Sequence, residues 1–240
     1  TLTITNVPTS TLAREADYAL SLHAGPEIAV ASTKAYTAQV ATSALLAKAL
    51  GDFKGTQAAQ DLDIKHELSI VASAQQTLVD QKDSIHALVG KMLKTTRNAF
   101  YIGRGGDYYV ALEAALKLKE ISYIQAEGFA AGELKHGTIS LVEDGTLMIG
   151  VLTQPALYEK TISNMVECKA RGAYLMGLTT YGNYNIEDSA DFVIYIPKID
   201  PHFATSLAVV PLQLLGYYIS VSKGLDVDKP RNLAKSVTVE

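Results

Sequence analysis

The sequence predicts an α/β fold of the doubly wound type, with a parallel sheet between two helical layers (three-layer α/β/α). Short apolar runs rich in Val, Ile and Tyr alternate with longer helical patterns, which is typical of strand–helix–strand units. Apolar residues make up 48% of the chain and charged residues 19%, as in ordinary globular proteins. With 240 residues the chain can bury a substantial core in one large domain or two small ones.

The expected elements follow from two sequence patterns. Short runs of β-branched, aliphatic and aromatic residues between breakers predict strands over 2–7, 18–23, 99–103, 147–153, 173–179 and 192–197. Apolar residues at helical spacing predict helices over 32–50, 107–122, 155–170 and 204–223. Helix formers with few breakers continue between residues 61 and 94, where we expect helices that link two α/β units.

These elements divide the chain unequally. Residues 98–224 have enough strands and helices for a complete doubly wound domain, whereas residues 1–54 offer two strands and one long helix. Because a parallel sheet needs helices on both faces, we expect the first part to be the C-terminal part of a larger domain. Residues 55–97 are then a helical linker that packs on the second domain, and residues 225–240 form a separate charged tail.

Charge and cysteine content limit the functional classes. A net charge of -4 gives no electrostatic footprint for nucleic acid, so no nucleic-acid partner is expected. The single cysteine, Cys168, excludes an internal disulfide and a cysteine-built zinc site. Its place in a predicted helix favours a buried apolar role and fits a reducing cytoplasm. No metal-ligand spacing and no cofactor fingerprint is present, so we expect neither metal nor organic cofactor.

One uncharged segment, residues 203–222, is long enough to span a bilayer. It contains several polar residues, and neither a second span nor a basic flank accompanies it. A helix buried between a sheet and a neighbouring subunit explains it better, so we expect no membrane partner. The first residues also lack a basic-then-apolar signal pattern, and we expect a cytoplasmic protein.

A glycine turn, Gly103-Arg-Gly-Gly106, follows the strand predicted at 99–103 and leads into a helix. Such a turn can bring backbone amides up to a phosphate at the helix N-terminus. Glycines also serve simply to bend the chain, and the rest of a phosphate fingerprint is missing. The turn alone therefore does not establish a phosphate site.

Three charged residues share one face of the next predicted helix, since Lys117 lies four residues after Glu113 and three before Glu120. One interpretation is a solvated, ion-paired surface without function. The other is catalytic, because a carboxylate beside a lysine, held in a site that tunes its pKa, can transfer a proton.

Two further segments carry reactive side chains. The sequence AGELKHG over 131–137 places His136, which titrates near neutrality, among glycines rather than in an apolar core. The tail sequence DKPRNLAK over 228–235 gathers cationic and amide groups, although charged chain ends are commonly mobile and idle. A lysine such as Lys235 can act as a nucleophile only in its neutral form, which Arg231 can favour if it does not instead orient the tail.

The loop over residues 25–34 precedes a predicted helix. Ser32 or Thr33 is expected to cap that helix, and Glu27 is expected to be exposed.

Three segments together, ALEAALKLKEISYI over 111–124, AGELKHG and the tail, resemble the isomerase half of the glutamine–fructose-6-phosphate aminotransferase (glucosamine-6-phosphate synthase) family. The resemblance covers essentially the whole chain. It implies tandem sugar isomerase (SIS) domains, of which the first is truncated here, with the phosphate-binding loops upstream of residue 1. It also implies a reaction of fructose 6-phosphate with ammonia to give glucosamine 6-phosphate, and a separate N-terminal glutaminase domain that releases the ammonia.

The resemblance further implies residue roles. Lys235 matches the lysine that forms a Schiff base with fructose 6-phosphate, and Glu120 the carboxylate that moves the proton between C1 and C2. Lys117 matches the lysine that assists this transfer. His136 matches the ring-opening histidine, which the partner subunit of a homodimer contributes. The substrate-binding positions are implied at Val30, Ala234 and Arg231, the first two through their backbone.

Two alternatives remain open. Another SIS enzyme, a phosphosugar isomerase or deaminase that uses no glutamine, would lack the upstream glutaminase domain. A non-catalytic phosphosugar-binding module that regulates a partner would lack Glu120, His136 or Lys235, and all three are present.

Overall fold

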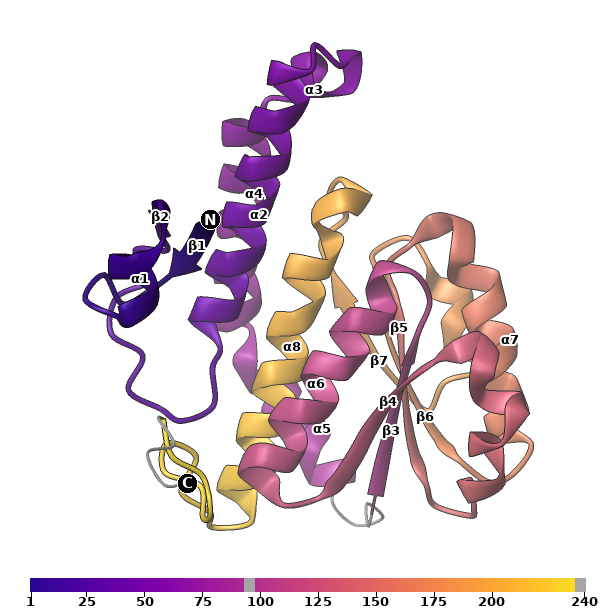
Figure 1. Ribbon diagram of the computed structural model, residues 1–240. Coiled ribbons are helices and arrows are strands. Elements are labelled where there is room, and N and C mark those ends of the chain that lie inside the picture. The colour runs from indigo at the N-terminus through magenta and orange to yellow at the C-terminus, as the bar shows by residue number, and fades with distance from the viewer. Residues whose placement is uncertain (93–97, 236–240) are drawn as a thin grey trace.

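The computed structural model describes residues 1–92 and 98–235, and a five-stranded sheet lies at its centre (Figure 1). All neighbouring strands are parallel, in the order β4-β3-β5-β6-β7. The strands are β3 (Asn98–Gly103), β4 (Gln125–Ala130), β5 (Leu147–Leu152), β6 (Tyr174–Thr180) and β7 (Phe192–Ile196). The chain starts inside the sheet, moves to one edge and then returns across it, which is the doubly wound order. The predicted fold class is confirmed.

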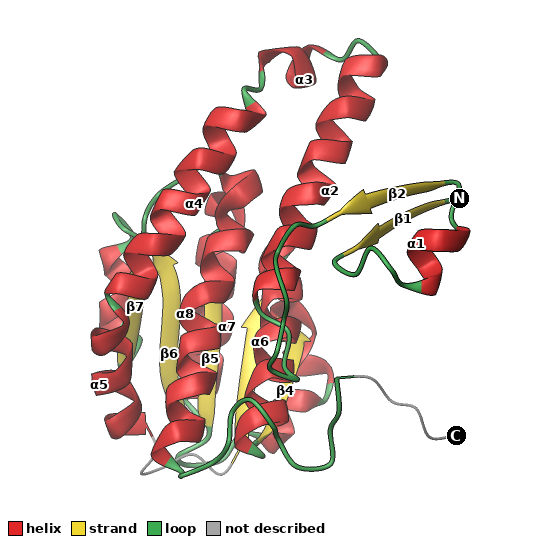
Figure 2. Cartoon of the chain, turned by 90° about the vertical axis from the view of Figure 1, so that its left-hand side faces the viewer, coloured by secondary structure: helices red, strands yellow, loops and turns green. Residues whose placement is uncertain are grey.

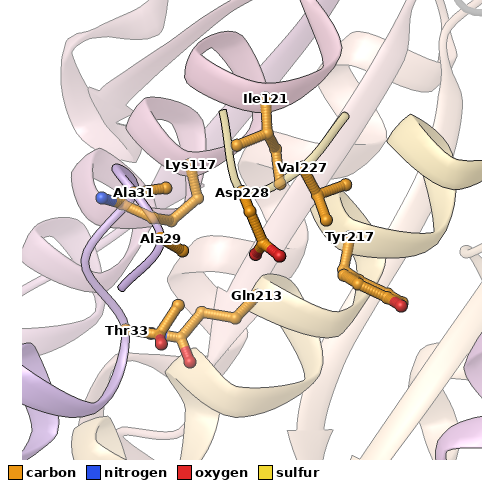
Figure 3. Close-up of a pocket in the computed structure, with 9 residues that line it drawn as sticks. All are labelled: Ala29, Ala31, Thr33, Lys117, Ile121, Gln213, Tyr217, Val227 and Asp228. Carbon is orange, nitrogen blue, oxygen red and sulfur yellow. The ribbon is translucent and has the colours of Figure 1, made fainter. Parts of the chain in front are cut away.

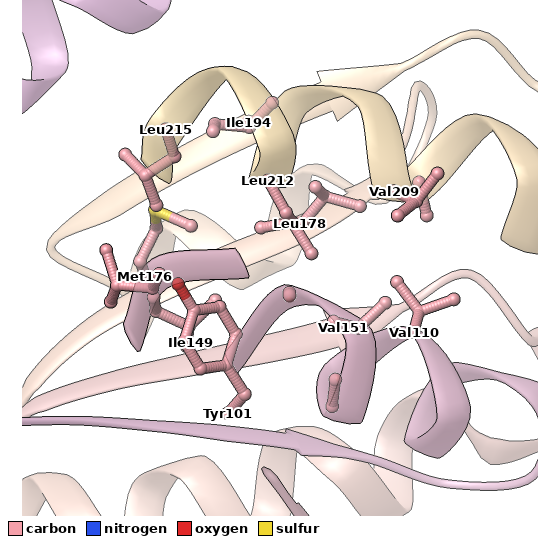
Figure 4. Packing of buried hydrophobic residues seen from close by; sticks show 14 of the residues in the cluster. Tyr101, Val110, Ile149, Val151, Met176, Leu178, Ile194, Val209, Leu212 and Leu215 are labelled. Atoms are coloured by element: carbon pink, nitrogen blue, oxygen red, sulfur yellow. The ribbon is translucent and has the colours of Figure 1, made fainter. Parts of the chain in front are cut away.

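Helices cover both faces of this sheet. On one face lie α5 (Lys82–Met92), α6 (Gly106–Ser122) and α8 (Pro201–Ser222), and on the other lies α7 (Tyr158–Lys169) (Figure 1). Tyr101, Ile149 and Leu178 point from the strands into the first helical layer and are fully buried there (Figure 4). Every residue of β5 is buried, because a central strand with two covered faces has no solvent side.

Short turns of 3-10 helix complete the second layer. They are η1 (Ala131–His136), η2 (Thr138–Leu141), η3 (Pro155–Leu157) and η4 (Tyr184–Asp188). Cys168 is fully buried in α7, in agreement with the apolar role predicted for it.

The prediction of strands was incomplete at β4. This edge strand reads QAEGFA and lacks β-branched residues, so its sequence carries no strand signal. Gly128 explains its position, since a Cβ there would lie 2.9 Å from the backbone of Ala111 in α6. The close approach of α6, rather than local propensity, holds β4 in place.

The N-terminal part is smaller and more open. β1 (Leu2–Thr5) and β2 (Tyr18–Ser21) form a separate two-stranded parallel sheet, connected by α1 (Thr11–Glu15). Two long helices, α2 (Lys34–Phe53) and α4 (Ile64–Asp80), rise side by side and are joined by α3 (Gln57–Asp61) (Figure 2).

The region between residues 61 and 94 is helical as expected, and α4 and α5 contribute to the core beneath α8. The division into four segments and its three boundaries stay predictions. Residues 93–97 of the expected linker and residues 236–240 of the expected tail lie outside the described residues.

Helix α8 contains the uncharged segment. By length and composition alone it could cross a membrane, and 67% of its apolar window is buried inside the protein. Buried positions such as Leu207, Leu212 and Leu215 pack on the sheet and on α6. This burial is the pattern of a core helix.

Candidate active site

The charged face of α6 is buried rather than solvated. Lys117 is only 4% exposed, and its Nζ lies 2.8 Å from Oε2 of Glu120 and 3.5 Å from Oε1 of Glu113. The helical spacing of three and four residues produces this cluster, as the sequence predicted. A surface ion pair is wrong as an explanation, because the amine has lost nearly all contact with water.

The two carboxylates of this cluster differ in their surroundings. Burial raises the pKa of Glu113, Lys117 lowers it less, and repulsion from Glu120 adds to the rise. The Oε2 atom of Glu120 is buried and accepts no hydrogen bond from the described residues, so its contact is the ion pair with Lys117. A carboxylate held in this way has lone pairs free for a proton.

The tail folds back onto the C-terminal end of α6. Tyr123 ends that helix in the left-handed conformation (φ 59°), and its ring lies 4.2 Å beneath the Arg231 guanidinium. The hydroxyl of Tyr123 accepts a hydrogen bond of 2.7 Å from the Arg231 backbone N–H. Of the two roles considered for Arg231, these contacts favour orientation of the tail.

The folded tail encloses a pocket beside Glu120. This pocket has a volume of about 430 Å³ and is lined by Leu116, Lys119, Glu120, Tyr123, Arg231, Asn232 and Leu233. Ala234 follows directly and is exposed. The carboxylate predicted to be catalytic therefore faces a space closed on one side by the tail.

The loop before α2 meets the same tail (Figure 1). The Val30 backbone N–H donates to the Asp228 carbonyl at 3.0 Å. The Lys235 amine donates to the carbonyl of Ala29 at 2.9 Å and to that of Val30 at 3.4 Å. Two segments about two hundred residues apart in the sequence thus bring the predicted nucleophile to the predicted substrate-binding backbone.

The expectation for the start of α2 was wrong in two respects. The helix begins at Lys34, and the side chain of Thr33 at the N-cap makes no capping hydrogen bond. Glu27 is not exposed, since only 10% of its side chain is accessible. Its Oε1 accepts from the Thr33 N–H at 2.7 Å and its Oε2 from the Ser32 hydroxyl at 3.1 Å.

Glu27 is also electrostatically coupled to the tail. Partial burial alone would raise the pKa of Glu27, but the hydrogen bonds from Thr33 and Ser32 and the nearby Lys235 ammonium hold that pKa below its usual range. Its Oε2 lies 3.7 Å from the Lys235 amine.

A second, smaller pocket of about 170 Å³ is lined by Lys117 (Figure 3). Lys117 comes from α6, Gln213 and Tyr217 from α8, and Asp228 from the tail. The Nε2 atom of Gln213 is buried without a hydrogen-bond partner among the described residues. Lys117 lines this smaller pocket and is ion-paired with Glu120, which lines the larger one.

Sequence reasoning did not assign a role to Gln213 or Tyr123. No local pattern distinguishes an amide on a buried helix from other polar residues in α8. Tyr123 gains a role only through its tertiary contacts with Arg231 of the tail.

His136 does not meet Glu120 within the chain. His136 is exposed and ends η1, beyond the C-terminal end of β4, whereas Glu120 precedes the N-terminal end of that strand. A strand of six residues covers about 17 Å, so the two residues lie beyond opposite ends of β4.

The glycine turn after β3 contains its own carboxylate. Asp107 is 2% exposed and accepts hydrogen bonds from the Thr153 N–H (2.7 Å), the Thr153 hydroxyl (2.5 Å) and the Gln154 N–H (3.2 Å). Burial raises the pKa of Asp107 more than these hydrogen bonds lower it. The carboxylate accepts hydrogen bonds from the backbone N–H groups that follow β5. This arrangement favours a structural role for the turn over phosphate binding.

In the described ranges, 1–92 and 98–235, no three His, Cys, Asp or Glu side chains form a group that could hold a metal ion. The expectations of no metal and no cofactor stay predictions.

The chain matches the family described as the SIS domain over residues 1–49 and 92–223. The fold and this match define its class, and the chain belongs to the SIS domain family. It is 57% identical over 239 residues to "Glutamine--fructose-6-phosphate aminotransferase [isomerizing]" of Streptococcus pneumoniae. It is 59% identical over 239 residues to the protein of the same name from Lactiplantibacillus plantarum. In both cases the alignment covers 100% of this chain but 39% of the relative.

A solved structure is similar as well. It is the C-terminal domain of glucosamine-fructose-6-phosphate aminotransferase from Francisella tularensis, with a TM-score of 0.87 and 35% sequence identity. The match covers 95% of this chain and 64% of that chain.

Proposed function

We propose that the chain is the isomerase part of a glutamine–fructose-6-phosphate aminotransferase, which converts fructose 6-phosphate and ammonia to glucosamine 6-phosphate. The observation that carries the proposal is the meeting of three segments. The tail places the Lys235 amine on the carbonyls of Ala29 and Val30 while it covers the pocket of Glu120. The names of the 57% and 59% identical relatives support the same reaction.

The reaction assigns one step to each group. The neutral Lys235 amine attacks the C2 ketone of the open-chain sugar, and loss of water gives the imine. Ammonia then replaces the lysine at C2 and frees its amine. Glu120 takes a proton from C1 and returns it to C2, which yields the amino aldose. Lys117, at 2.8 Å, stabilises the ionised form of Glu120 before the first transfer and after the second.

His136 opens the sugar ring from the partner subunit of a homodimer. Its separation from Glu120 by the length of β4 supports this arrangement, because one chain cannot supply both groups to one sugar. An exposed histidine at an element end is accessible to a second copy.

The rest of the activity resides outside these residues. The chain spans about two fifths of the curated relatives' length, 39%. We assign the glutaminase domain, which supplies ammonia, and the phosphate-binding loops of the first SIS domain to additional sequence, and we place the protein in the cytoplasm.

Borohydride trapping tests the imine. The full natural chain that contains these residues is incubated with fructose 6-phosphate, reduced, digested and analysed by peptide mass spectrometry. We expect a sugar-phosphate adduct on Lys235 that is lost in Lys235→Arg and kept in Lys229→Arg. An active enzyme without this adduct, or with an adduct on another lysine, would contradict the proposal and favour an isomerase that uses Glu120 alone.

Glu120→Gln separates the two steps. The variant should still form the adduct, since the imine does not need the carboxylate, but product formation should fall about 100-fold or more. Unchanged product formation would contradict the role of Glu120.

A further inference from the structure

The amine of Lys235 lies close to three acceptor groups. The carbonyl of Ala29 lies at 2.9 Å, that of Val30 at 3.4 Å and the carboxylate of Glu27 at 3.7 Å. An ammonium group has three N–H donors and no acceptor, so this arrangement matches the protonated lysine. A neutral amine has one donor fewer and carries no charge for Glu27 to attract.

Glu27 is itself fixed. Its two oxygens accept from the Thr33 N–H and the Ser32 hydroxyl, immediately before α2. The N-terminal end of a helix favours a negative charge, which these contacts place there. The position of the carboxylate is therefore set by contacts within its own loop and does not depend on the lysine.

Two other charged side chains lie near this loop. Lys34 donates to the Pro26 carbonyl at 2.6 Å, and the Asp228 carboxylate lines the smaller pocket. Within the described ranges, Glu27 is the carboxylate found within 4.0 Å of the Lys235 amine.

We propose that Glu27 is a positioning residue that holds the Lys235 ammonium on the 29–30 backbone before the sugar binds and thereby keeps the tail docked over the active site. This inference rests on the proposed function. Loss of a proton from the ammonium to solvent breaks the contact with Glu27 and makes the amine a nucleophile. The imine nitrogen that then forms has at most one N–H, so the lysine leaves its acceptors as it joins the sugar.

Glu27→Gln tests the inference, because glutamine can keep a hydrogen bond from Thr33 but loses the charge. Glu159→Gln, on the exposed surface of α7, is the matched control. Both variants and the unsubstituted protein are made as the full natural chain. Two properties are measured: hydrogen–deuterium exchange of the 229–235 peptide without sugar, and the rate of Lys235 trapping against pH.

We expect Glu27→Gln to raise exchange in the tail about threefold and to move the pH midpoint of trapping down by about 0.5 unit, since an exposed pair has a modest effect. The control should change neither. A tail that exchanges as before, together with an unmoved midpoint, would overturn the inference while the adduct on Lys235 upholds the proposed function. If the unsubstituted protein forms no adduct on Lys235, both proposals fail together.

A merely structural role for Glu27 gives a different result. In that case Glu27→Gln would lower the melting temperature and the total amount of adduct but leave the midpoint of the pH profile unchanged. That outcome also counts against a positioning role.

Discussion

Both sheets of this protein consist of parallel strands, but one is buried and the other is exposed. In the five-stranded sheet the central strand β5 is buried along its whole length, whereas in the two-stranded sheet every residue of β2 is exposed. Parallel strands gain stability mainly from helices that cover both faces. The candidate active site joins these two regions, because α6 packs on the first sheet and the loop of Val30 follows the second. One half of the site is therefore rigid and the other is more loosely held.

A leucine truncation in each sheet is the strongest test of this difference. Leu178→Ala in β6 removes a fully buried side chain and should lower the free energy of unfolding by about 3 kcal/mol. Leu20→Ala in β2, at a position 37% exposed, should cost less than about 1 kcal/mol. Urea denaturation measures both values, and equal losses would show that the sheets are equally well supported.

The hydrogen bonds that Asp107 accepts from Thr153 and Gln154 provide a second test of the rigid half. Asp107→Ala leaves the amides of Thr153 and Gln154 without their acceptor and should lower the free energy of unfolding by about 2 kcal/mol. Asp107→Asn should cost less, because its amide oxygen can still accept one of these hydrogen bonds. An alanine variant as stable as the parent would mean that water replaces the carboxylate without loss.

The tail provides a smaller effect. Tyr123→Phe removes the acceptor of the Arg231 N–H but keeps the ring beneath the guanidinium. Loss of one hydrogen bond, about 1 kcal/mol, should raise hydrogen–deuterium exchange in residues 229–235 about fivefold. The global unfolding midpoint should not change. Tyr174→Phe, at a partly exposed tyrosine of β6, is the control and should leave the tail unaffected.

The smallest effect is the pH dependence of the loop. The pKa of Glu27 is held below the value of 4.5 in the unfolded chain. Its contribution to stability is therefore complete above pH 4.5 and disappears as the pH falls through the folded-state pKa. Parent and Glu27→Gln should differ by less than about 1 kcal/mol at pH 7 and converge as the pH falls through the folded-state pKa. A gap that widens on acidification would contradict the assigned direction.

The sequence predicted the rigid half well because its signals are local. Short, mainly apolar runs marked β5 (LMIGVL) and β6 (YLMGLTT), and the spacing of three and four residues placed Lys117 between Glu113 and Glu120. β4 was not predicted, because the close contact of Gly128 with α6 is a tertiary contact that leaves no periodic pattern in the sequence.

The loosely held half was less predictable for the same reason. Lys235 and Val30 were identified by resemblance, but the sequence did not indicate that Glu27 faces the lysine or that Tyr123 receives Arg231. Both contacts join residues more than a hundred positions apart, and neither residue type is unusual in its local segment. Such contacts between polar residues far apart in the sequence become visible only in the folded structure.

The hydrogen bond from Val30 to Asp228 also sets an order of events during synthesis. A ribosome makes residue 30 long before residue 228. The loop after β2 therefore leaves the ribosome before Asp228, its hydrogen-bond partner, has been synthesised, and the five-stranded sheet is translated in between. The sheet can fold as soon as β7 and α8 have left the ribosome, because its strands all precede residue 224. The tail arrives last and joins surfaces that are already in place. A nascent chain stalled before residue 225 would therefore carry a folded scaffold and an unformed active site.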